Sequence, residues 1–219
     1  MDWDEHAERE EERYRDGLER LPEDPDARQK QLVRVAMAAG GAGLARLMQG
    51  RRAEAVGWLA RSAERYRDSY EHAPPESWGR LIGALKARLL AGDAERAAAD
   101  ARWASGERPA ESGSPIGWYA AALAELVLGR DEEAGDLAGR LQAASEEQAF
   151  PPPVADALSA LAANDGEAYG EAVERVLDSF ETREAYLEDI PVADTVMVLE
   201  VLAERRGLAA RPESALLPD

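Results

Sequence analysis

Apolar residues recur along this chain three and four positions apart, and polar residues fill the positions between them. This spacing places the apolar side chains on one face of a helix. No run alternates convincingly with the period of two that a half-buried strand requires. The pattern therefore predicts an all-α protein of about ten helices. Its clearest stripe consists of Trp78, Leu81, Ile82, Leu85 and Leu89.

Other segments follow the same rule. An amphipathic helix is expected over residues 3–20, and Asp26 is expected to cap the next one. That second helix contains three glycines, which either break it or let a neighbouring helix approach closely; they are Gly40, Gly41 and Gly43. A later inward face is expected to consist of Ile116, Tyr119, Leu123, Leu126 and Val127.

Two expectations concern the end of the chain. A short helical turn is expected around Arg183–Glu188. The last long helix is expected to start at Pro191 and to be the most buried element, because it is apolar nearly all round. Gly207 is expected to stop it.

Corners between helices repeat along the chain. A small corner residue is followed five positions later by alanine in Gly50 with Ala55, Gly92 with Ala97, Gly129 with Ala134 and Ala163 with Ala168. Successive corners lie roughly 34 to 42 residues apart, a period typical of stacked helix pairs. We therefore expect one domain over residues 1–219, built as a tetratricopeptide-like, right-handed solenoid of antiparallel hairpins. Pro74 and Pro75 suggest sub-units 1–73 and 74–219.

The composition of the chain indicates the salt conditions in which the protein works. The formal net charge is -18, and only Lys30 and Lys86 among the 26 basic residues are lysine. This combination is typical of a salt-loving microbe, in which salt screens carboxylate repulsion; an ordinary acidic cytosolic protein is the alternative. The absence of cysteine excludes disulfides and thiolate metal sites.

Several classes of function are disfavoured. The first residues lack the basic start and apolar run of a signal peptide, and no stretch has the apolar length of a membrane span. We therefore expect a cytoplasmic protein with no membrane partner. Nucleic acid is not expected as a partner either, because phosphate binding needs a clustered basic surface.

Candidate chemistry is sparse. His6 and His72 are the only histidines and have no second ligand at metal-binding spacing, so no metal is expected. Ser69, His72 and Glu76 form no nucleophile elbow, and the glycine-rich stretch lacks the sequence of a phosphate-binding loop. The chain is therefore predicted to be no enzyme, with no catalytic residues and no cofactor.

Aromatic residues provide the candidate binding site. Trp78 and Trp118 start two successive inward-facing helices, for which core packing is favoured over a ligand lining. The partner-binding candidates are Trp78, Arg80, Trp118 and Tyr119.

A family resemblance goes further. It rests on Trp78 to Ala97, on Phe150-Pro151-Pro152 leading to Ala157–Asp165, and on Leu199–Leu208 with Ser214–Pro218. On these residues, segment 77–219 resembles the all-helical immunity proteins of bacterial polymorphic toxin systems, family forty-nine. Leu216 stands where that family's closing motif has an aromatic residue.

The resemblance implies a module that binds and neutralises a cognate toxin. An acidic concave face favours a basic partner, and screening in high salt shifts lasting affinity to exposed aromatic anchors. The alternatives are a self-associating structural or regulatory protein, such as a homodimer, and an enzyme with an unrecognised site.

Overall fold

The computed structural model describes residues 2–144, 150–186 and 190–218. Ten α-helices, one short 3-10 turn and no strands are found in these ranges, which confirms the all-α prediction. The chain divides into two compact units, which are described separately. The amino-terminal unit consists of Met1–Asp93, Glu184–Val192 and Ala215–Asp219, and the carboxy-terminal unit consists of Ala94–Arg183 and Ala193–Ser214.

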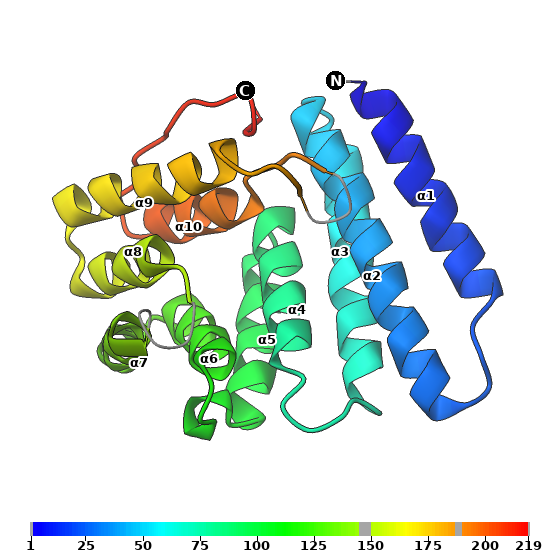
Figure 1. Cartoon of the computed structure of the whole chain (residues 1–219), viewed down its shortest axis with the longest axis horizontal. Coiled ribbons are helices and arrows are strands. Elements are labelled where there is room, and N and C mark those ends of the chain that lie inside the picture. The colour runs from blue at the N-terminus through cyan, green and yellow to red at the C-terminus, as the bar shows by residue number, and fades with distance from the viewer. Residues whose placement is uncertain (1, 145–149, 187–189, 219) are drawn as a thin grey trace. The chain divides into compact units, whose positions relative to one another are not determined.

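In the amino-terminal unit, each helix packs against the next one along the chain (Figure 1). The helices are α1 (Trp3–Glu19), α2 (Pro25–Met48), α3 (Arg52–Tyr70) and α4 (Trp78–Ala91). The long helix α2 lies between α1 and α3 and contacts both. Because α4 packs on α3, the observed boundary falls at Asp93, about twenty residues beyond the proline pair that suggested a sub-unit boundary.

The carboxy-terminal unit continues with the same sequential packing, and its last helix contacts both α8 and α9 (Figure 1). Its helices are α5 (Ala94–Gly106), α6 (Pro115–Leu128), α7 (Asp131–Ala144), α8 (Pro152–Ala163), α9 (Gly166–Glu181) and α10 (Asp194–Glu204). A 3-10 turn, η1 (Pro109–Glu111), precedes α6. None of the helices in the described ranges combines the length and apolarity needed to cross a bilayer.

Four corners have the left-handed backbone that ends a helix. Three are the predicted glycines, Gly50, Gly92 and Gly129, with φ of 69°, 75° and 72°. Each is followed five residues later by a fully buried alanine. The predicted fourth corner is wrong by one residue, because Asn164 has φ 56° and the buried residue five positions on is Tyr169. Asparagine tolerates this conformation better than alanine does.

The glycines of α2 do not break the helix. A Cβ on Gly43 would lie 2.7 Å from Cγ of Leu59 in α3, and a Cβ on Gly41 would lie 3.0 Å from Cγ of Glu10 in α1. Close approach is therefore the correct alternative. This close approach leaves Glu10 fully buried. The Glu10 carboxylate binds Arg9 at 3.0 Å and Arg13 at 2.8 Å.

Two predicted helix starts are wrong. Asp24, and not Asp26, caps α2, because Pro25 takes the first helical position and the Asp24 carboxylate accepts from the Ala27 amide. The last helix begins at Asp194, beyond Pro191. It ends at Glu204, and Gly207 stops it as predicted, with φ 73° and the Leu208 amide donating back to the Ala203 carbonyl at 2.9 Å.

Burial also departs from two expectations. The expectation that the last helix is the most buried is wrong: α4 and α6 each bury nine of their fourteen residues, whereas α10 buries five of eleven and leaves Met197 and Val201 half-buried. Ile116, predicted to face inward, is 48% exposed in the first turn of α6. The expected turn around Arg183–Glu188 is not helical over residues 183–186, and its remaining residues lie outside the described ranges.

Candidate protein-binding surface

Trp78 and Arg80, two of the predicted binding residues, are packed into the amino-terminal unit. Trp78 is 8% exposed, and its buried indole N–H has no hydrogen-bond partner among the described residues. The Arg80 guanidinium donates to the Ser69 carbonyl in α3 and to the Gln29 side chain in α2, and burial lowers the pKa of Arg80. Both side chains thus join α4 to its neighbours.

Trp118 and Tyr119, the other two predicted residues, belong to the carboxy-terminal unit. Tyr119 is 8% exposed, and its ring lies 5.5 Å from the Phe150 ring at a tilt of 56°. Trp118 is half-buried, and its indole N–H donates to the Ser112 carbonyl at 2.7 Å. The burial of Trp78 agrees with the core packing that the sequence favoured for Trp78 and Trp118, whereas Trp118 is only half-buried.

An aromatic surface that the sequence did not predict lies in the amino-terminal unit. The rings of Tyr14 in α1 and Trp58 in α3 meet edge to face, 5.3 Å apart at 86°. The Arg61 guanidinium lies 4.8 Å from the centre of the Trp58 ring, close enough for a cation–π interaction. Trp58 and Leu18 are half-buried and rest on the core formed by Tyr14 and by Val35, Ala38 and Ala39 of α2. We call Tyr14, Leu18, Trp58 and Arg61 the aromatic face.

Trp58 escaped prediction because it lies at the edge of the apolar stripe of α3. The stripe contains Val56, Leu59, Ala63, Tyr66 and Tyr70, and Trp58 falls between two of its members. Only the i, i+3 spacing of Trp58 and Arg61 indicates their contact in the sequence. Their pairing with Tyr14 depends on α1 and α3 both packing against α2.

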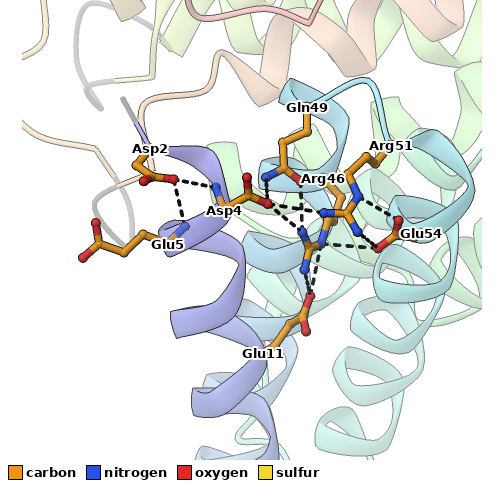
Figure 2. A network of polar contacts seen from close by, with 8 residues as sticks. All are labelled: Asp2, Asp4, Glu5, Glu11, Arg46, Gln49, Arg51 and Glu54. Atoms are coloured by element: carbon orange, nitrogen blue, oxygen red, sulfur yellow. Dashed lines mark hydrogen bonds and ion pairs between the residues drawn. The ribbon is translucent and has the colours of Figure 1, made fainter.

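A network of charged side chains joins the same three helices (Figure 2). The Arg46 side chain, which is 8% exposed, lies 2.7 Å from the Glu11 carboxylate and 3.7 Å from that of Glu54. Arg51 binds Glu54 at 2.7 and 2.8 Å and Asp4 at 3.3 Å. The hydrogen bond that Arg51 donates to Glu54 is the main cause of a raised pKa of Arg51. The network therefore connects α1 and α3 to the carboxy-terminal end of α2 through ion pairs.

A hollow of about 720 Å³ opens beside this network. It is lined by Asp2, Trp3, Asp4, Gln49 and Arg51. The Trp3 ring lies 5.6 Å from the His6 ring, and the Asp2 carboxylate caps α1 by accepting from the amides of Asp4 and Glu5. These polar groups are engaged in ion pairs and a helix cap. Within the described part of the chain, no group of three or more potential ligand residues could hold a metal ion.

A stripe of exposed carboxylates follows α9 in the carboxy-terminal unit. Its members recur at i, i+4, i+7, i+11 and i+14 and extend over about 21 Å of helix. On the opposite side, α9 contributes six buried residues to the core, and the Tyr169 hydroxyl is the polar group among their side chains. We call the carboxylates the acidic stripe; they are Glu167, Glu171, Glu174, Asp178 and Glu181.

Comparison of this chain with protein-family models, curated proteins and solved structures finds no significant match.

Proposed function

We propose that this chain is a non-enzymatic protein-binding module, built from tetratricopeptide-like hairpins, that contacts its partner through the aromatic face. The observation that carries the proposal is the half-buried Trp58, held between Tyr14 and Arg61. Tryptophan, tyrosine and arginine dominate the residues that contribute most to protein–protein affinity. A rigidly held indole also loses little conformational freedom on binding.

The charge of the chain favours a basic partner. A net charge of -18 and the acidic stripe of α9 attract a cationic surface over a distance set by the salt concentration. Such attraction acts mainly on the association rate. In concentrated salt, where it is screened, the aromatic face is expected to supply the lasting affinity.

A cytoplasmic immunity protein is the role most consistent with this reading. Nuclease toxins bind phosphate and are often basic, so an acidic inhibitor with an aromatic anchor suits them. This role rests on the resemblance of segment 77–219, together with the acidic surface.

The experiment begins with capture of partners by the full chain in molar potassium chloride. Captured proteins are identified, purified and titrated against the wild type and a Trp58→Ala variant. Loss of an interface anchor typically costs 2 kcal/mol or more, so we expect the affinity to fall by about thirtyfold. A Trp118→Ala variant of the other unit is the control and should bind as the wild type does.

Charge reversal of Glu132 and Glu133, both exposed in the first turn of α7, distinguishes the contribution of the aromatic anchor to affinity from the contribution of charge. In molar salt this double variant should bind with nearly unchanged affinity. A Trp58→Ala variant that melts like the wild type and binds equally well would refute the proposal. So would a dominant effect of the charge reversals in molar salt.

The homodimer alternative requires a contact surface between two copies of this chain. Trp78 is already buried within one chain, so a dimer contact through it would require local rearrangement. Sedimentation of the purified chain tests this alternative directly. A stable dimer that dissociates on Trp58→Ala substitution would make a second copy the partner of the aromatic face.

A further inference from the structure

The segment that follows α10 lies along α9. Residues 208–214 have no regular secondary structure, and Figure 1 shows this red segment running beside α9. At one end, a Leu208 methyl carbon lies 3.4 Å from the position of a Cβ added to Gly166. At the other end, the Ser214 hydroxyl donates to the Glu181 carboxylate at 2.6 Å. We call residues 208–214 the strap.

The two contacts lie at opposite ends of α9. Gly166 and Glu181 are the first and last residues of the helix, about 22 Å apart along its axis. Six extended residue steps from Leu208 to Ser214 cover about 20–22 Å. The strap is therefore long enough to reach both ends of the helix, although the left-handed Arg211 interrupts its extended backbone. Around Arg211, two backbone N–H groups turn toward an acceptor outside the strap.

Glu200 of α10 is that acceptor. Its carboxylate accepts from two consecutive amides of the strap, Ala210 at 3.3 Å and Arg211 at 2.7 Å. The same carboxylate accepts from the hydroxyl of Tyr169, which is fully buried in α9, at 2.6 Å. One carboxylate can accept from two consecutive amides only where the backbone turns, as it does at the left-handed Arg211. Because these contacts involve backbone rather than side chains, they suit any segment that makes the same turn with two adjacent N–H groups free.

The strap follows the cap that ends α10. Gly207, immediately before it, has φ 73°, and the Leu208 amide donates back to the Ala203 carbonyl at 2.9 Å. Arg206 anchors the chain just before Gly207 by donating to the carbonyl of Leu126 at 2.9 Å and to that of Leu202 at 3.2 Å. Arg211 within the strap has φ 54°, which is uncommon for a residue with a side chain. The docked strap thus has a backbone conformation that a free chain rarely adopts.

We propose that the strap is displaceable and fills, in cis, a peptide site along α9, with Glu200 as the group that binds the peptide backbone. The ligand class is a segment of a partner protein that makes the left-handed turn seen at Arg211. It carries an aliphatic side chain over Gly166, two adjacent free amides at Glu200 and a hydroxyl near Glu181. This site lies in the carboxy-terminal unit and is independent of the aromatic face.

Hydrogen exchange of the full chain tests whether Glu200 holds the strap. Glu200→Ala should speed exchange of the strap amides by about tenfold or more, the loss expected for hydrogen bonds to a charged acceptor. The helices α9 and α10 should keep their protection. Glu204→Ala, an exposed glutamate on the same helix, is the matched control and should change nothing. Unchanged strap exchange in Glu200→Ala, or equal loss of protection in α9 and α10, would overturn the proposal.

A labelled peptide of residues 207–214 tests the site itself. The tethered strap competes at a millimolar effective concentration, so the peptide should bind the wild type weakly. A full chain carrying Leu208→Ala and Ser214→Ala has a weakened strap and an intact site, and should bind the peptide at least about fivefold more tightly. Adding Glu200→Ala to that chain should abolish the gain. Equal peptide binding by all three chains would show that no such site exists.

Discussion

Gly83 in α4 provides a direct test of the packing between α3 and α4. A Cβ at this position would lie 2.5, 2.6 and 2.8 Å from three ring atoms of Tyr66. An aromatic ring moves as a rigid plate, so it cannot yield at one atom alone. Replacing Gly83 with alanine should therefore force the ring out of its site or push the two helices apart.

The magnitude follows from two opposing terms. Alanine in a helix interior is favoured over glycine by up to about 1 kcal/mol. Overpacking a close contact costs about 1–3 kcal/mol. We therefore expect Gly83→Ala to lower the free energy of unfolding by about 0–2 kcal/mol. Gly79→Ala on the same helix, where nothing lies within 4 Å of an added Cβ, should raise it by up to about 1 kcal/mol.

Urea unfolding followed by far-ultraviolet circular dichroism, at one fixed salt concentration, measures both variants. In a chain of this length, each 1 kcal/mol corresponds to about 2–4 °C in Tm, which gives a second readout. A Tyr66→Leu background closes the double-mutant cycle, because the penalty of Gly83→Ala should largely disappear once the ring is absent. Equal stabilisation by Gly79→Ala and Gly83→Ala would refute the reasoning, as would a penalty that persists without Tyr66.

Three further predictions follow from charge, corner geometry and burial. Lowering potassium chloride from molar to tens of millimolar should lower Tm, because the net charge of -18 loses its screening; a flat or rising Tm would contradict this. Gly92→Val and Gly129→Val should each cost about 1–2 kcal/mol in the free energy of unfolding, because both positions are left-handed; unchanged stability would contradict the corner assignment. Burial, with the hydrogen bond to Glu200, raises the pKa of Tyr169. Its neutral form therefore contributes stability that is complete below about pH 10 and lost above it, and Tyr169→Phe should flatten this alkaline loss in melting experiments.

Local signals identified most helices and three of the four corners. The caps at Ser114 and Asp165 were predictable because a capping side chain accepts from an amide only three residues away. Pro25 misled the prediction of the neighbouring cap by two residues, since it takes the first helical position and makes Asp24 the cap. The fourth corner failed because alanine spacing was followed where the left-handed residue is Asn164.

The candidate surfaces depended on contacts between distant residues. Tyr14 meets Trp58 only because α1 and α3 both pack on α2, and Arg46 meets Glu11 only because α1 packs on α2. No periodicity within one helix encodes such a meeting, so sequence reasoning selected tryptophans at helix starts, of which Trp78 is buried.

The sequence by itself determined the helical class, the corners at Gly50, Gly92 and Gly129, and the acidic character of the chain. These properties depend on composition and on interactions that span a few residues. Only the tertiary structure decided that the α2 glycines are contact points and that Glu200 holds the strap. Both depend on which helix lies beside which, because the free energy of packing is shared among residues that the chain brings together only on folding.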